Sequence, residues 1–372
     1  MVELLVAMTI SLFMLLAIAV VYSTSKTGFA FANNTVRMSE DAAFALEMMS
    51  RDIRIAGYAG CSGTSVAVDA AGVVTYTPKL NAISGLILNT ASNKPNPFIG
   101  VSSGELGAQI FTANNSVWGF AANNSSAMSI LGGSTTSYTA STTEPMLYLA
   151  GGSNQALQIS DAVATATSPI NIPANTYGWS NSSPVIPTFL IISDCKGSEV
   201  FRASSAQPAS GKFVITHDAI DNNSENLANS YGSDAIVTSL NTSVYFVATR
   251  TGATTASLYR RYFNGTAAVS EEIVPNVEKI TFQYGINTSN TSAGLPTYQV
   301  DAYEANPDSI TDWSRVVSIR MGLIMISEED GQGTTKANQN IPWLGGTYAS
   351  PSDARLRRAY STTVSIRNRM GL

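Results

Sequence analysis

Residues 4–22 read LLVAMTISLFMLLAIAVVY, a run of 19 residues without a charge, a glycine or a proline. As an α-helix this run is about 28 Å long, close to the thickness of the hydrocarbon core of a bilayer. Its length and composition predict a membrane-spanning helix. A cleaved signal peptide is the alternative, but it needs positive charge before the apolar run, and only Met1, Val2 and Glu3 precede it here.

The helical pattern continues beyond the apolar run, because residues 23–58 are amphipathic with a period near 3.6. The residues expected on the apolar face are Phe44, Met48 and Ile55, with Leu46, Met49 and Ile53 beside them. Gly57 and Gly60 provide the signal that ends the helix. The sequence therefore predicts one helix of about 55 residues, with a transmembrane half over 1–22 and an amphipathic half over 23–58.

Glu3 stands at the N-terminal edge of the apolar run. One interpretation places its carboxylate in water at the headgroup level, where it also stabilises the helix N-terminus through the helix dipole. The other pairs it with a positive group, such as the N-terminal amine of another subunit, because an unpaired carboxylate buried in a membrane costs up to a few kcal/mol. The residues alone favour the first interpretation.

Charge is scarce and unevenly distributed along the 372 residues. Charged residues make up 13% of the chain, against about a quarter in an average protein, and the net charge is −5. Residues 62–193 carry six of the 47 charges, whereas residues 194–372 carry 32. The acidic total argues against a basic nucleic-acid binder, and the single histidine excludes any site that needs two.

The neutral middle, residues 62–186, is rich in Ser, Thr, Asn, Ala and Gly. Its candidate strands span residues 73–76, 85–88 and 146–149, and turn signals such as Gly151-Gly152 separate them. We expect a β- and loop-rich insertion within a head domain over 59–372. Two roles remain open for it, simple enlargement of the domain and a contact or adhesive surface.

The second half of the chain predicts a sheet. Segments rich in Val, Ile, Tyr, Phe and Thr cover residues 188–193, 199–203, 212–216, 243–249, 257–263, 277–284, 316–327 and 362–366. In the segment 316–327 the odd-numbered residues from Val317 to Met325 are expected on the core face. A mostly antiparallel sheet covering the apolar face of the helix makes an α+β fold.

No motif points to catalysis. His217, next to Asp218 at a strand end, is the one histidine, and the sequence has no G-x-S-x-G elbow, H-E-x-x-H or P-loop. The acidic residues Asp301, Glu304, Asp308 and Asp312, and the run Glu328-Glu329-Asp330-Gly331, lack EF-hand spacing and are expected in solvated loops. The predictions are therefore no enzyme, no cofactor and no metal site.

Residues 2–7, VELLVA, resemble the core of the class III signal of type IV pilins and type II secretion pseudopilins. Further stretches resemble PilW-type minor pilins, namely residues 51–61 (RDIRIAGYAGC), 193–195 (SDC), 258–261 (LYRR), 274–285 (VPNVEKITFQYG), 313–320 (WSRVVSIR) and 357–369 (RRAYSTTVSIRNR). The resemblance covers both ends and the second half of the chain and is weak across residues 62–186.

The resemblance implies a pilin-like fold and a structural role in type IV pilus assembly, in a priming and tip complex with other minor pilins. In that family Glu3 would neutralise the N-terminal amine of a neighbouring subunit inside the filament. N-terminal methylation, twitching motility and cell adhesion are further expectations. The alternatives are a type II secretion minor pseudopilin and, from another class, a membrane-anchored periplasmic or surface adhesive protein outside any filament.

The resemblance also implies partners and a location. The partners are other minor and major pilins, the inner-membrane assembly platform and a tip adhesin. The protein would sit in the bacterial inner membrane with a periplasmic head and then reach the extracellular pilus. In that oxidising compartment Cys61 and Cys195 are expected to form a disulfide, with two separate buried thiols as the alternative.

Arginines cluster near the end of the chain, at Arg355, Arg357, Arg358, Arg367 and Arg369, and Arg260 and Arg261 are candidates to lie close to them. A local basic patch of this kind could bind DNA despite the acidic total. Strand-edge charge and salt bridges facing the helix are the favoured interpretation, so a nucleic-acid partner is not expected.

Overall fold

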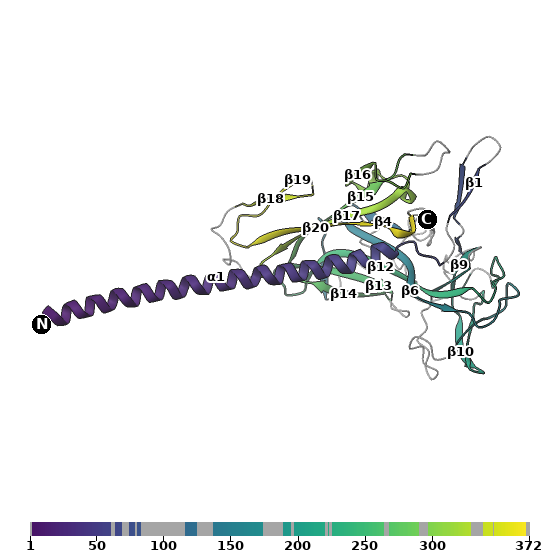
Figure 1. The fold of residues 1–372 in the computed structure, drawn as a ribbon, viewed down its shortest axis with the longest axis horizontal. Coiled ribbons are helices and arrows are strands. Elements are labelled where there is room, and N and C mark those ends of the chain that lie inside the picture. Colours follow the sequence, from purple (N-terminus) through teal and green to yellow (C-terminus); the bar gives the residue numbers. More distant parts are fainter. Residues whose placement is uncertain are drawn as a thin grey trace.

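The computed structural model describes residues 2–60, 64–68, 74–78, 80–82, 116–124, 137–173, 189–194, 197–219, 222, 225–263, 268–289, 297–328, 338–344 and 346–369. One long helix, α1 (Val2–Ile55), projects from a β-rich head, with the N-terminus at the far end (Figure 1). This arrangement agrees with the predicted α+β class. The predicted strand over 85–88 lies outside the described residues.

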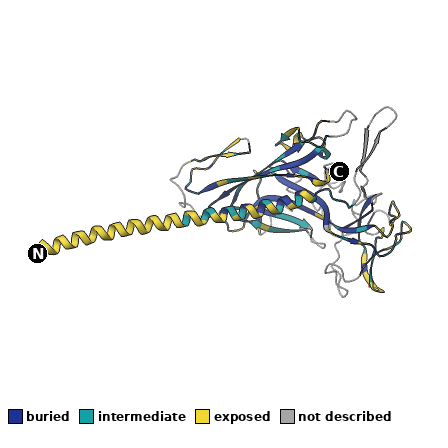
Figure 2. Ribbon diagram, viewed as in Figure 1, coloured by how far each residue is buried: buried dark blue, intermediate teal, exposed yellow. Residues whose placement is uncertain are grey.

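Helix α1 has 54 residues and is therefore about 81 Å long. Its first half is exposed on all sides, and burial begins only where the head starts (Figure 2). The helix ends before Gly57, whose φ of 78° is the left-handed conformation that commonly terminates helices. One unbroken helix of the predicted length is thus confirmed.

Of the residues predicted on or beside the apolar face of α1, Met49 and Ile53 are fully buried, which confirms that part of the prediction, but the rest of the buried face differs. It consists of residues spaced by three or four, Met38, Ala42, Ala45, Met49, Ile53 and Ala56. Phe44, predicted on the apolar face, is 54% exposed because it lies on the opposite side of the helix. The alanines at the centre of the face let the strands approach the helix backbone closely, which a phenylalanine there would prevent.

Among the described residues the largest sheet has nine strands, with a main path in the order β14-β13-β12-β8-β9-β3, while β5 and β6 pair with β12 and β4 pairs with β6. These strands are β3 (Leu80–Ala82), β4 (Val117–Phe120), β5 (Tyr138–Ala140), β6 (Met146–Gln158), β8 (Phe189–Ser193), β9 (Ser198–Arg202), β12 (Ile236–Arg250), β13 (Ala256–Phe263) and β14 (Ala268–Val274). Among the strand pairs of the described residues, β3–β9 alone is parallel.

A four-stranded sheet, β16-β15-β17-β20, faces the first across the helix. Its strands are β15 (Val277–Ile286), β16 (Ala302–Glu304), β17 (Val316–Ile326) and β20 (Arg357–Ser365). The remaining strands form a three-stranded sheet, β7 (Ile170–Pro173), β10 (Ser205–Ala209) and β11 (Lys212–Thr216), and the hairpins β1 (Thr64–Val68) with β2 (Val74–Pro78) and β18 (Asn340–Trp343) with β19 (Gly346–Ala349). The 3₁₀ helices of the described residues are η2 (Pro307–Ser309), η3 (Trp313–Arg315) and η4 (Arg367–Arg369).

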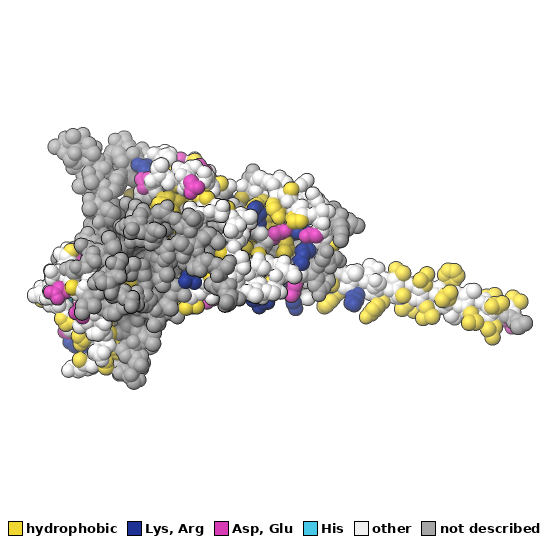
Figure 3. Space-filling view, turned by 180° about the vertical axis from the view of Figure 1, so that it is seen from behind, with side chains coloured by type: hydrophobic (Ala, Val, Ile, Leu, Met, Phe, Trp, Pro, Cys, Tyr) yellow, Lys and Arg dark blue, Asp and Glu magenta, His cyan; other side chains and the backbone are white. Residues whose placement is uncertain are grey.

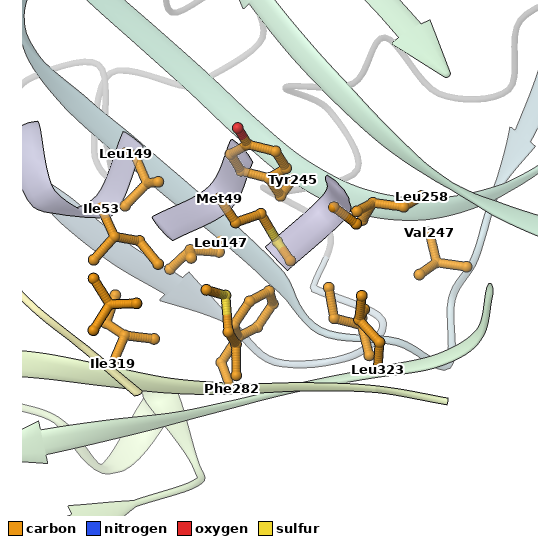
Figure 4. Packing of buried hydrophobic residues seen from close by; sticks show 14 of the residues in the cluster. Met49, Ile53, Leu147, Leu149, Tyr245, Val247, Leu258, Phe282, Ile319 and Leu323 are labelled. Carbon is orange, nitrogen blue, oxygen red and sulfur yellow. The ribbon is translucent and has the colours of Figure 1, made fainter. Parts of the chain in front are cut away.

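The main core lies where α1 passes between the two sheets. Met49 and Ile53 of the helix are fully buried there (Figure 4). On one side they meet Leu147, Leu149, Tyr245, Val247 and Leu258 from the nine-stranded sheet, and on the other Phe282, Ile319 and Leu323 from the four-stranded sheet. The helix therefore completes a sandwich that neither sheet closes alone.

Strand β17 is buried on both faces. Four of the five odd-numbered residues predicted to face the core do so, Ile319, Met321, Leu323 and Met325, but Val316 takes the place of Val317. The register of β15 against β17 shifts between Gly285 and Ile286, and Ile286 is the residue opposite Val316. The other face of β17 is covered by the hairpin β18–β19, whose Trp343 and Leu344 lie against Gly322 of β17.

A separate core lies at the end of the head away from the helix. It contains Leu157, Ile159, Val163, Ile170, Ile172, Leu190, Ile192, Phe201, Ala206, Phe213, Ile215, Leu227, Tyr231, Ala235 and Val237. We call this part of the head, built around the three-stranded sheet, the distal lobe. The long strands β6 and β12 run from the main core into it, so the two parts share a continuous sheet.

Candidate assembly interface

The part of α1 that projects from the head, residues 2–29, is the most apolar surface of the described chain, and we call it the projecting half. Every large hydrophobic side chain that is exposed among the described residues lies on α1, from Val2 to Phe44. Leu4, Phe13 and Val20 are 65%, 71% and 59% exposed. Figure 3 shows these side chains covering the helix beyond the head. The helix is long and apolar enough to cross a membrane, and none of its most apolar window is buried in the head.

Glu3 lies in the first turn of α1 and is exposed, at the end of the helix farthest from the head. A carboxylate there interacts favourably with the positive end of the helix dipole. The length of the projecting helix separates it from the described residues of the head (Figure 1). Its assembly role remains a prediction from the resemblance.

The other end of α1 is fixed to β6 by close backbone contact. The amide of Gly57 donates to the carbonyl of Ala150 at 2.9 Å, and the amide of Gly152 donates to the carbonyl of Tyr58 at 2.7 Å. A Cβ on Gly151 would lie 2.3 Å from the carbonyl oxygen of Ile55. The predicted turn at Gly151-Gly152 is therefore wrong: both glycines lie inside β6, where they make room for the helix end.

The end of the chain completes the helix C-terminus. The side-chain amide of Asn368 in η4 donates to the carbonyl of Ala56 at 3.1 Å, which satisfies one of the free carbonyls of the last turn. Farther up the helix, the hydroxyls of Ser39 and Tyr360 lie 2.9 Å apart. Strand β20 and η4 thus contact the part of α1 that packs against the head, from Met38 to Ile55, which we call the docked half.

A charged cluster clamps the same region. The hydroxyl of Tyr245 donates to the Asp52 carboxylate at 2.7 Å, and Arg260 lies 3.5 Å from Asp52 and 2.8 Å from Glu271. Burial, reinforced by the charge of Asp52, raises the pKa of Tyr245 well above its usual value, so the phenol stays a donor. This cluster joins the helix to β12, β13 and β14.

Most of the arginines singled out in the sequence are engaged in structure. Arg357 is 1% exposed between Glu278 and Asp353, and its hydrogen bonds lower the pKa of Asp353. Arg355 donates to the carbonyl oxygens of Ser327 and Glu328, and Arg261 to the hydroxyl of Ser270. Arg358 and Arg367 are exposed, and the side chain of Arg369 lies outside the described residues. This arrangement supports the structural interpretation over a DNA-binding patch.

The lone histidine belongs to the distal lobe. His217 is 4% exposed, packs edge-on against Phe201, and places Nε2 3.1 Å from the carbonyl oxygen of Ser168. Nearby, the fully buried Glu199 accepts hydrogen bonds from Ala228, Asn229 and Tyr231. Both side chains connect strands to loops through these hydrogen bonds.

Of the acidic residues predicted in loops, Glu304 instead ends β16 and Asp308 lies in η2, while Asp301 and Asp312 act as local caps. The Asp301 carboxylate accepts from the amides of Thr288 and Ser289, and these hydrogen bonds lower its pKa. Asp312 caps the amide of Ser314. Over the described part of the chain, no group of three His, Cys, Asp or Glu side chains is arranged to hold a metal ion.

Both predicted disulfide partners, Cys61 and Cys195, lie outside the described residues, so the disulfide remains a prediction. Residues close to them in the chain are in contact. Ser198 donates to the carbonyl of Ala59 at 2.6 Å, and a Cβ on Gly60 would lie 2.2 Å from the hydroxyl oxygen of Ser193.

A family model described as Type IV Pilus-assembly protein W matches residues 244–368, about a third of the chain. The match runs from within β12 to η4 and includes β14, β17 and β20, three of the strands that contact α1. No curated protein and no solved structure matches the chain. The similarity supports a type IV pilus-related protein that takes part in pilus assembly, and the apolar helix supports membrane anchoring.

Proposed function

We propose that the chain is a structural minor pilin of a type IV pilus. The apolar half of α1 holds the subunit in the inner membrane, with the head in the periplasm. On extraction the same surface leaves the lipid and packs among the helices of other subunits in the filament. The mechanism is assembly rather than catalysis, and the chain needs no cofactor.

The continuity of α1 carries this proposal. A plain membrane tether needs no more than the first 22 residues, yet the helix continues unbroken to Ile55 with its last turns buried between two sheets. The position of the head relative to the apolar half is therefore set by a stiff rod. Such a rod is useful where many subunits must stack in register and is unnecessary for a free anchor.

The similarity to a pilus-assembly family over β12–η4 supports a role in starting assembly. In this proposal the chain joins other minor pilins in a priming complex that ends at the pilus tip, beneath a tip adhesin. Its partners are the minor and major pilins and the inner-membrane assembly platform. Glu3 neutralises the terminal amine of a neighbouring subunit, because each unpaired charge in an apolar bundle costs several kcal/mol.

Gene deletion followed by complementation tests the proposal. Deletion is expected to reduce surface pili, counted by electron microscopy, and the wild-type gene to restore them. Glu3→Gln keeps the size of the side chain but removes its charge, so it should reach the membrane yet fail to restore pili, whereas Glu3→Asp should restore them in part. Normal pilus numbers in the deletion strain would contradict the proposal.

The same strains separate the alternatives. A loss of protein secretion with normal pili would identify a type II secretion pseudopilin. A loss of surface adhesion with normal pili and secretion would identify a membrane-anchored adhesive protein.

A further inference from the structure

Strand β20 forms an open edge of the head. It is the outer strand of the four-stranded sheet, and within the described residues β17 is the one strand that pairs with it. The pairing runs over nine consecutive residues, from Arg357 opposite Ile326 to Ser365 opposite Ser318, without a register shift. The edge is therefore long and regular.

Two hydrogen bonds define which backbone groups face outward. The amide of Ile366 donates to the carbonyl of Val317, and the amide of Ser327 donates to the carbonyl of Leu356, both at 2.9 Å. Even-numbered positions of this segment thus bond to β17. Because successive residues of a strand point their amides and carbonyls to opposite sides, the odd-numbered residues present theirs to the open edge. These are Ala359, Ser361, Thr363 and Ser365.

Four other outer strands carry features that discourage pairing with another chain. Strand β14 contains Glu271 and Glu272, and β10 contains Pro208, which has no amide hydrogen to donate. Strands β3 and β16 have three residues each. Strand β20 reads RRAYSTTVS, with no proline, no glycine and no charge after its second residue. It lacks each of the protective features of these four strands.

The ends of this edge are positively charged. Arg358 near the start of β20 and Arg367 just past its end are both exposed. At about 3.3 Å per residue they stand roughly 30 Å apart along the strand. Between them the exposed side chains are Ser361, Thr363 and Ser365, which are small and neutral.

We infer that the open edge of β20 binds an extended segment of a second polypeptide, which adds a fifth strand to the sheet. Backbone hydrogen bonds supply the affinity in such strand addition, and side chains supply the selection. The segment that fits has a neutral, β-branched centre and a carboxylate at each end, opposite Arg358 and Arg367. This site lies on the head and does not require α1 to enter a filament.

A peptide strand fits this edge better than a nucleic acid does. Two exposed arginines roughly 30 Å apart provide few of the phosphate contacts on which nucleic-acid affinity depends. A row of amides and carbonyls between them matches the backbone of a strand and not a sugar-phosphate chain.

The test uses the full chain in detergent micelles and a fluorescein-labelled peptide, Asp-Thr-Val-Thr-Val-Thr-Val-Thr-Asp. Saturable binding by the wild type is expected in fluorescence anisotropy. A peptide methylated on alternate backbone nitrogens, so that one edge has no donors, should bind at least tenfold more weakly. A peptide with Asn in place of both Asp residues should bind more weakly at low salt and about equally at high salt.

Variants of the protein test the same edge from the other side. Thr363→Pro removes an outward amide and leaves the bonds to β17 intact, so peptide binding should fall at least tenfold. Thr363→Ala removes the side chain and keeps the amide, so binding should stay within twofold of wild type. Circular dichroism of both variants checks that the sheet is retained.

Three outcomes of the peptide measurements would overturn the inference. They are no saturable binding of the peptide, equal binding of the methylated peptide, and unchanged binding by a folded Thr363→Pro variant. Tight binding of a labelled nine-nucleotide DNA strand that depends on Arg358 and Arg367 but not on Thr363 would also overturn it, because the arginines would then be a phosphate site.

Discussion

The two halves of α1 belong to one unbroken helix but have opposite surroundings. Up to about residue 29 every described side chain is exposed, including the whole apolar run. From Met38 onward one face of the helix is buried between the two sheets, and alanines, methionines and an isoleucine form this face. The docked half has its partners within the chain, whereas the projecting half must find them in a membrane or another subunit. Substitutions matched between the halves measure this difference.

Glycine-to-alanine changes should give the largest contrast. Gly151→Ala places a methyl group 2.3 Å from the carbonyl oxygen of Ile55, so the helix end must move, and the free energy of unfolding of the head should fall by about 3 kcal/mol or more. Gly28→Ala in the projecting half has nothing within 4 Å and should change it by less than about 0.5 kcal/mol. Urea unfolding in detergent, followed by tryptophan fluorescence, measures both. Equal effects would contradict the close docking of the helix end.

Truncation of apolar side chains comes next. Ile53→Ala empties a fully buried site and should destabilise the head by about 2–5 kcal/mol. Leu12→Ala removes a side chain that is 68% exposed and should leave head unfolding unchanged while weakening retention in the membrane. The same urea titration and a membrane-extraction assay give the two readouts.

The predicted disulfide would fasten the docked half further. If Cys61 and Cys195 are joined, replacing both by Ser should cost about 2–5 kcal/mol. Thiol labelling of the unfolded, unreduced protein decides the matter directly, because two reactive thiols per chain would end the disulfide prediction.

The ion pairs of Arg357 should make the sheet beneath the docked half sensitive to acid. The folded pKa of Asp353 is lowered by Arg357, so its stabilisation is present above the unfolded pKa of about 3.9 and is lost as the pH falls through the folded pKa. Asp353→Asn should cost about 1.5–3 kcal/mol at pH 7, and the difference from wild type should shrink below about pH 4. The exposed Asp218→Asn is the control. A difference that does not change with pH would show that the ion pair contributes nothing.

Among substitutions on the docked half, Phe44→Ser should have the smallest effect on folding. Phe44 is 54% exposed on the docked half but faces away from the head, so head stability should change by less than about 0.5 kcal/mol. Pilus numbers should still fall, since an exposed apolar side chain at this position serves a contact outside the chain. Normal pilus numbers in the Phe44→Ser strain would show that Phe44 makes no contact needed for pilus assembly.

Much of the architecture could be predicted from the sequence because it depends on local patterns. The uncharged run, the 3.6-residue period and Gly57 were sufficient for one helix of nearly the correct length. The buried face is predicted less well. Which of two neighbouring residues is buried, such as Ala45 and not Phe44, depends on how closely the strands approach the helix. Packing distance is a property of the whole fold and leaves no local signal.

Long-range contacts at the helix end could not be predicted for the same reason. Gly151-Gly152 fits a turn and a close approach equally well, and only the presence of Ile55 against β6 distinguishes them. Asp52 and Arg260 form part of the stretches that resemble PilW-type proteins, yet nothing local indicates that they meet. The assembly role of Glu3 is predicted only from its position at the edge of the apolar helix and from the resemblance to pilins.

The cap on α1 has a consequence for the order of events during synthesis. Asn368, which completes the last turn, lies 312 residues after Ala56 in the chain. At roughly 5–20 residues per second, about 15 to 60 seconds separate the two residues at the ribosome. Throughout that interval the apolar run is already available for insertion into a membrane. The strands and the 3₁₀ helix that pack against the docked half are not yet all synthesised. If the apolar run enters a membrane during this interval, anchoring precedes folding of the head, and a chain that lacks its last few residues has a helix whose C-terminal turn is left without its cap.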